Sequence, residues 1–179
     1  MPRLIAFLRA VNVGGRTVKM DALRTEFEAL GFTDVETFIA SGNVIFKTPA
    51  RNTPALARKI EAHLLAALGL HFDTFVRSSA EVVAIAGHQP FSAAAMAAAG
   101  ALNVGFLADP LDTQAVAQLD KLKTGIDDFH THGRELYWLC QKKQSESTFS
   151  NAVFEKQLKL KATFRGINTV RKLAEKYPG

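Results

Sequence analysis

Apolar and polar positions alternate along the first 78 residues in a pattern that predicts four strands and two helices. The expected strands are short runs of apolar and β-branched residues, at 4–11, 35–39, 44–47 and 72–77. Between them, apolar residues recur every three or four positions, which predicts helices at 21–30 and 53–68. Thr53 precedes Pro54 and is the expected N-cap of the second helix. The resulting order, βαββαβ, is that of a ferredoxin-like αβ-plait.

The second half of the chain has a less regular pattern. Its expected elements are a helix at 79–87, a loop or weak helix at 90–100, a strand at 103–108, a helix capped by Asp112, a hairpin around Gly133, and helices at 151–159 and 168–176. We therefore expect an α+β protein that forms one compact body, with a ferredoxin-like lobe at 1–78 and a second, divergent αβ lobe with basic C-terminal helices at 79–179. No Pro/Ser linker separates the lobes, and no sequence repeat indicates duplication.

The helix and strand faces of the first lobe predict one core beneath a four-stranded antiparallel sheet. Eight residues are expected in it: Phe7, Leu23, Phe27, Leu30, Val44, Ile60, Leu64 and Phe75. The alternation of Leu136, Trp138 and Cys140 likewise predicts that the single cysteine is a buried, unreactive thiol. One cysteine cannot form an internal disulfide, which favours a cytoplasmic location.

Composition adds one asymmetry to this picture. The chain has 179 residues, 47% hydrophobic and 22% charged, as in an ordinary globular protein. Residues 141–179 hold nine basic and three acidic side chains, a net charge of +6, whereas residues 1–140 carry −1. This basic C-terminal segment predicts an anionic partner. The uncharged stretch 82–108 is too rich in alanine and polar residues to span a membrane, so no membrane association is expected.

A glycine-rich basic loop follows the first expected strand. Adjacent glycines let successive backbone N–H groups converge on an anion, and nearby cations and a helix N-terminus add positive potential. The candidate binding residues of this segment are Arg9, Asn12, Gly14, Gly15, Arg16 and Lys19. The spacing is neither that of a P-loop nor that of a dinucleotide-binding fingerprint. The alternative interpretation is a turn that needs glycine dihedrals and exposes its arginines.

A second candidate segment begins the last expected helix. Asn168 is the expected N-cap, and positive charge gathers around the helix start, where an anion is favoured. The candidate residues are Arg165, Asn168, Thr169, Arg171 and Lys172. The alternative is a docking helix with a solvated basic face.

Other chemistry is weakly indicated by the sequence. His130 and His132 share one strand face and supply two metal ligands without an evident third, so neither a metal nor another cofactor is expected. Asp127 and Asp128 are neighbours on a strand and should point to opposite faces, which excludes a catalytic carboxylate pair. The catalytic residues, if any, are not predicted, and neither is the oligomeric state.

Several short motifs occur together in one order along the chain. They are residues 8–16 (Leu-Arg-Ala-Val-Asn-Val-Gly-Gly-Arg), 19–24, 41–46 (Ser-Gly-Asn-Val-Ile-Phe), 150–151 and 163–173. The set resembles the bacterial domain-of-unknown-function family DUF 1697, which implies αβ-plait content and no particular activity. Relatives usually have Arg-Gly-Ile-Asn at 9–12 and a Trp at the position of Ile167. The resemblance leaves Asn12, Gly14, Gly15, Arg165, Asn168 and Thr169 as the matching site candidates.

These observations favour a protein that binds an anionic ligand, either nucleic acid or a nucleotide-like phosphate, through the loop and the C-terminal helix. Two alternatives stay open. The first is an enzyme that acts on a phosphorylated or carboxylated small molecule between the lobes. The second is a non-catalytic module whose basic end docks an acidic protein.

Overall fold

The computed structural model describes residues 1–11, 15 and 17–179, and it divides into two compact units. The first unit comprises Met1–Val83 together with Leu173–Gly179, and the second comprises Ala84–Lys172. The chain therefore leaves the first unit after Val83 and returns to it for its last seven residues.

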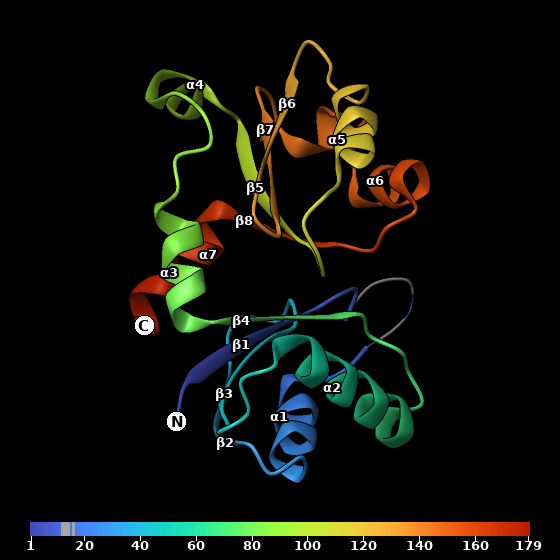
Figure 1. Ribbon diagram of the computed structural model, residues 1–179, viewed down its shortest axis with the longest axis vertical. Helices are drawn as coiled ribbons and strands as arrows, with labels where there is room; N and C mark the ends of the chain where they lie inside the picture. The colour runs from blue at the N-terminus through green and yellow to red at the C-terminus, as the bar shows by residue number, and fades with distance from the viewer. Residues whose placement is uncertain (12–14, 16) are drawn as a thin grey trace. The chain divides into compact units, whose positions relative to one another are not determined.

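The first unit is an αβ-plait with the predicted element order. Its elements are β1 (Arg3–Leu8), α1 (Met20–Ala29), β2 (Thr33–Thr37), β3 (Asn43–Lys47), α2 (Thr53–Leu68) and β4 (Thr74–Ser78). All neighbouring strands are antiparallel, in the order β2-β3-β1-β4. Helices α1 and α2 lie together on one face of this sheet (Figure 1). The ferredoxin-like topology is confirmed.

The core between that sheet face and the two helices contains most of the predicted residues. Alternate β1 side chains, Leu4, Ala6 and Leu8, point into it. Five predicted residues belong to the buried cluster, with Leu30 packed at its margin: Leu23, Phe27, Val44, Ile60 and Leu64. Phe7 and Phe75 are buried too, but they pair in register on the opposite sheet face. Placing both in the helix-covered core was wrong, because side chains at odd and even strand positions face opposite ways.

Two local boundaries in this unit differ from the sequence-based prediction. Strand β1 ends at Leu8 instead of residue 11, and Ala10 takes a positive φ of 58° that no strand accommodates. The N-cap of α2 is Asn52, not Thr53: the Asn52 side chain accepts a hydrogen bond from the Ala55 N–H at 3.0 Å. Gly69 ends the helix at a φ of 69°, as expected of a C-terminal glycine.

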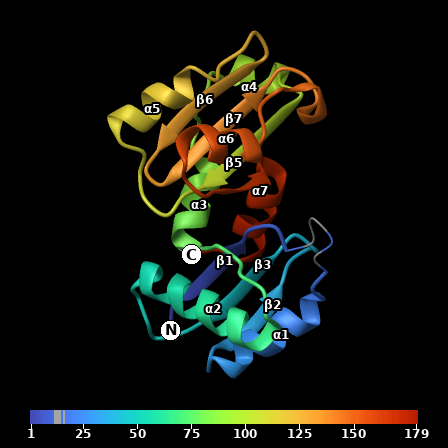
Figure 2. The same ribbon diagram turned by 90° about the vertical axis from the view of Figure 1, so that its right-hand side faces the viewer.

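The second unit contains another αβ-plait of the same topology. Its elements are β5 (Ala101–Phe106), α5 (Thr113–Asp120), β6 (Asp127–His132), β7 (Glu135–Cys140), α6 (Asn151–Leu158) and β8 (Thr163–Gly166). The antiparallel order is β6-β7-β5-β8, which repeats β2-β3-β1-β4 element for element. Helices α5 and α6 cover one sheet face, seen from two directions in Figures 1 and 2. The sequence pattern does not predict β8, which together with α6 completes this plait within the segment expected to hold only C-terminal helices.

Each plait is followed directly by a helix that continues into the other unit. Helix α3 (Ser79–Gly87) follows β4, and α7 (Ile167–Lys176) follows β8. The last turn of α7 belongs to the first unit, where Leu173 and Tyr177 are buried. The Arg3 guanidinium lies 5.5 Å from the centre of the Tyr177 ring. A short helix, α4 (Ala93–Ala98), and a 3-10 turn, η1 (Gln144–Glu146), complete the second unit.

Among the described residues, the helices are too short or too polar to cross a bilayer.

Candidate functional site

The glycine-rich loop of the first unit is only partly described. Asn12, Gly14 and Arg16 lie outside the described residues. Gly15 has a φ of 81°, and a Cβ added there would meet no atom within 4 Å. Exposed Lys19 is the N-cap residue of α1, without a side-chain cap. Arg9 follows β1, where its backbone N–H donates to the Asp73 carbonyl at 2.9 Å. Anion binding by this loop stays a prediction.

The second predicted segment lines a cavity within the second unit. This cavity has a volume of about 450 Å³ and lies at the start of α7. Three predicted site residues contribute to its wall: Asn168, Thr169 and Arg171. The remaining polar lining comes from Asn103 and Gln144, whose side-chain amides are joined by a 3.3 Å hydrogen bond. The cavity wall therefore combines a helix N-terminus, one cation (Arg171) and three amide side chains (Asn103, Gln144 and Asn168).

Asn168 does not cap α7. The helix begins at Ile167, immediately after Gly166 at the end of β8, so Asn168 lies inside the first turn. The prediction of an Asn168 N-cap was wrong because β8 was not recognised, and its direct junction with α7 leaves no capping loop. The first four N–H groups of an α-helix have no partner within the helix, and the Asn168 side chain is exposed at this end.

Arg165 and Lys172 are placed differently from the cavity residues. Arg165 is buried within the sheet, where its Nη1 donates to Thr163 Oγ1 at 2.7 Å and to the Phe164 carbonyl at 3.0 Å. Burial lowers the pKa of this guanidinium to about 10. Lys172 is exposed on α7 and is not part of the cavity wall. Arg165 thus has a structural role in β8, whatever else it binds.

A buried arginine at the equivalent position of the first plait was not anticipated. Arg77 lies on β4 two residues before α3, as Arg165 lies on β8 two residues before α7. Each pairs with the first strand of its own plait, Arg77 with Ile5 and Arg165 with Val104. Arg77 Nη1 also donates to the preceding carbonyl, at 3.1 Å. In the sequence, Arg77 and Arg165 each stand two residues before a helix. Their equivalence could not be recognised because β8, the strand that contains Arg165, was not predicted.

Three histidines of the second unit meet on one side of its sheet. His88 Nε2 lies 3.3 Å from His130 Nε2. The rings of His88 and His132 stack with centroids 4.0 Å apart and planes 11° from parallel. Burial lowers the pKa of His88, and repulsion by His132 and His130 lowers it further. The sequence pattern predicted only His130 and His132; the third imidazole comes from His88, directly after α3 and 42 positions before His130.

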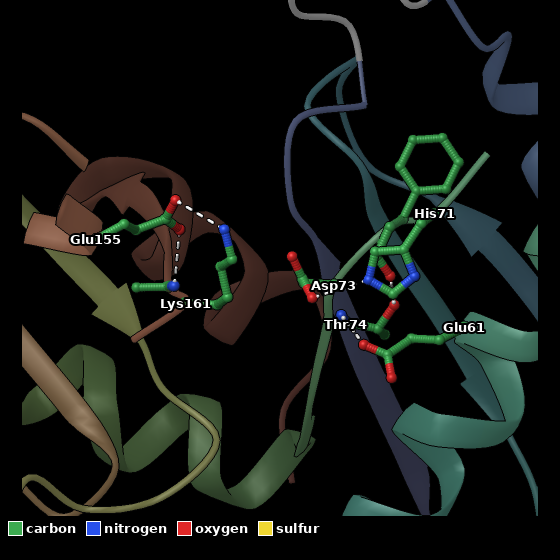
Figure 3. Close-up of polar contacts among 8 residues, drawn as sticks. Glu61, His71, Asp73, Thr74, Glu155 and Lys161 are labelled. Atoms are coloured by element: carbon green, nitrogen blue, oxygen red, sulfur yellow. Dashed lines mark hydrogen bonds and ion pairs between the residues drawn. The ribbon is translucent and has the colours of Figure 1, made fainter. Parts of the chain in front are cut away.

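A smaller polar cluster lies in the first unit. The Glu61 carboxylate accepts the Thr74 N–H at 3.0 Å, and His71 Nε2 lies 3.0 Å from Asp73 Oδ1; both contacts are drawn in Figure 3. Burial raises the pKa of the Glu61 carboxyl although the Thr74 hydrogen bond opposes this. In the second unit, Glu155 contacts Lys161 at 3.7 Å and accepts the Ala162 N–H (Figure 3). Each carboxylate thus accepts a backbone hydrogen bond at or next to the first residue of a strand, Glu61 at β4 and Glu155 at β8.

Two predictions, the burial of Cys140 and the opposite facing of Asp127 and Asp128, are confirmed, whereas the low reactivity of the thiol stays a prediction. Cys140 is fully buried, and burial raises the pKa of its thiol, which opposes formation of a nucleophilic thiolate. Asp127 is buried and Asp128 is exposed, with Lys123 Nζ 3.3 Å away, so the two carboxylates do point to opposite faces.

Two plaits of identical topology within one chain define a tandem αβ-plait protein. The chain belongs to the family described as protein of unknown function (DUF1697), whose model matches residues 1–137. It is similar in fold to a solved structure, the conserved bacterial protein SP0830 from Streptococcus pneumoniae, with a TM-score of 0.72 and 23% identity over 97% of each chain. No curated protein matches the chain.

Proposed function

We propose that the protein binds a small phosphate-bearing molecule, of about mononucleotide size, in the cavity at the start of α7. The observation that carries this proposal is that Arg171 and the first turn of α7 line the same cavity. Its volume of about 450 Å³ falls within the roughly 300–1,000 Å³ typical of small-molecule sites.

The cavity wall has the chemistry that such a ligand needs. Unpaired N–H groups and the positive end of the helix favour a phosphate. Arg171 adds a planar fork that can hold two phosphate oxygens. Asn103 and Gln144 offer amide groups, and Leu102, Met96 and Ile167 offer apolar surface to the remainder of the ligand.

This proposal narrows the broader expectation of an anionic ligand. A long nucleic acid needs a series of phosphate contacts along a surface, whereas the cavity suits one compact molecule. Participation of the glycine-rich loop stays a prediction, as does an enzymatic or protein-docking role. A cytoplasmic location is also part of the proposal, supported by the single cysteine, Cys140.

The test is a titration of the purified chain with phosphate, pyrophosphate and mononucleotides, following the thermal unfolding midpoint. A ligand at a hundred times its Kd should stabilise the protein by about 2.7 kcal/mol. Replacing Arg171→Gln removes a charge-assisted hydrogen bond worth about 1.5–3 kcal/mol, so Kd should rise about 10- to 100-fold.

The neighbouring Lys172→Gln is the matched control, because it removes the same charge from the same helix outside the cavity wall. It should leave Kd within about twofold. An unchanged midpoint with every anion, or equal losses in the two variants, would refute the cavity site. Tight binding of oligonucleotides but not of mononucleotides would refute it in favour of nucleic acid.

A further inference from the structure

The geometry of the second unit points to a metal site, and we propose that His88, His130 and His132 bind Zn²⁺ with one coordination position left open. The potential ligand nitrogens of the three side chains all lie within 4.8 Å of one another. They come from the residue that follows α3 and from strand β6, so the fold and not a local sequence motif brings them together.

The distance between two of these nitrogens matches zinc coordination. Zn–N bonds of about 2.0–2.1 Å at tetrahedral angles separate two ligand nitrogens by roughly 3.3–3.4 Å. His88 Nε2 and His130 Nε2 are 3.3 Å apart. The same separation allows an N–H···N hydrogen bond, so a proton or a metal ion can occupy the space between them.

His132 must turn to complete the site. Its ring is nearly parallel to that of His88, and two stacked rings direct their nitrogen lone pairs alongside each other instead of toward one point. His132 is exposed on β6, which is an edge strand of the sheet, so solvent is available on the side to which its ring would turn. Zinc binding would therefore break the stack of the His88 and His132 rings and bring one nitrogen of each of the three histidines to the metal.

The other two ligands are held in place by aromatic packing. Tyr137 is buried on β7, and its hydroxyl donates to the Ile85 carbonyl at 3.2 Å, which fixes the end of α3 just before His88. The Tyr137 ring centre lies 5.3 Å from that of His88, and the Phe91 ring packs edge-on against His130. Tyr137 and Phe91 thus pack against the imidazoles of His88 and His130.

Three neutral imidazoles with an open fourth position are a ligand set that zinc accepts, with water as the fourth ligand. Among the described residues, none accepts a hydrogen bond from a second ring nitrogen of these histidines. Such outer contacts typically contribute about 10- to 100-fold to affinity, so we expect the Kd to be weaker than in a fully supported site.

The experiment is equilibrium dialysis of tag-free, EDTA-treated protein against Zn²⁺ in phosphate-free buffer, with elemental analysis. One zinc ion per chain is expected. His132→Gln changes an exposed residue and should preserve folding while weakening binding by about tenfold or more. His88→Gln should weaken it at least as much, and Co²⁺ should give the visible absorption of a four-coordinate site in the unsubstituted protein but in neither of these two variants.

Two controls use the histidines outside this cluster. His63 contacts Glu26 in the first unit, and His71 belongs to the second group of potential ligands, Glu61, His71 and Asp73. His63→Gln and His71→Gln should bind zinc as the unsubstituted protein does. Absence of bound zinc, or loss of zinc in His71→Gln with retention in His132→Gln, would overturn the proposal. Neither result depends on whether the cavity beside α7 binds phosphate.

Discussion

Asp127 is a buried carboxylate surrounded by donors. Its oxygens accept hydrogen bonds from Trp138 Nε1 at 2.8 Å, from Thr124 Oγ1 at 2.7 Å and from Ser147 Oγ at 2.8 Å. Burial alone would raise the pKa of this carboxyl, but the hydrogen bonds together outweigh burial and lower it. The ionised form therefore ties the start of β6 to β7 and to the segment after η1.

This carboxylate should make stability depend on pH at the acidic end. Because the folded pKa is depressed, its contribution is fully present above the unfolded value of about 3.9 and is lost as pH falls through the folded value. Asp127→Asn should lower the unfolding free energy at pH 7 and flatten its decline below pH ~5. Urea titrations at several pH values measure both effects. Asp128→Asn, which alters an exposed neighbour, should keep the original pH profile, and identical profiles for both variants would contradict the assignment.

At the scale of single elements, helix α2 has two adjacent residues, Asn52 and Thr53, that could serve as its N-cap. Asn52 and Thr53 are both good capping residues, and Pro54 is compatible with either start. The Asn52 side chain accepts the Ala55 N–H, three residues ahead, so Thr53 becomes the first helical residue. Asn52→Ala should therefore cost about 1 kcal/mol of stability.

Thr53→Ala is the matched substitution for that cap. It exchanges a first-turn residue for a better helix former and should change stability by less than about 0.5 kcal/mol. Denaturant unfolding of both variants decides between them. If Thr53→Ala lowered the free energy of unfolding more than Asn52→Ala does, Thr53 and not Asn52 would be the N-cap.

At the scale of the whole molecule, the first unit is formed by two segments that are far apart in sequence. The chain builds its first unit, then the whole second unit, and finally completes the first with the last turn of α7. Leu173 and Tyr177 are buried there, and Lys176 Nζ lies 5.7 Å from the centre of the Phe38 ring. A segment near the C-terminus thus contributes to the stability of residues that begin the chain.

Leu173→Ala should consequently be severely destabilising, by about 2–5 kcal/mol, since truncating a fully buried leucine removes apolar contacts and leaves a cavity. Lys172→Ala, one position earlier on the exposed face, should change stability by no more than about 0.5 kcal/mol. Chemical denaturation measures both. A near-neutral Leu173→Ala would show that the last turn of α7 is dispensable to the first unit.

The sequence by itself determined the elements whose signals are local. The apolar periodicity and glycine stops located α1, α2 and α3, and the order βαββαβ was sufficient for the first plait. Strand β8 has only four residues, Thr163–Gly166, with Arg165 buried inside it, so neither length nor hydrophobicity marked it as a strand. Without β8, the second plait could not be completed, and its symmetry with the first was hidden.

Only the tertiary structure decided which distant residues meet. Local patterns assigned His130 and His132 to one strand face, but nothing near them in sequence indicates His88, which is brought there by the connection after α3. Similarly, the cavity joins Asn103 on β5 to Arg171 on α7 through sheet pairing between β5 and β8. The periodicity of apolar residues shows on which face of its own helix or strand a side chain lies. Which distant segments come together depends on how the helices and strands pack against one another.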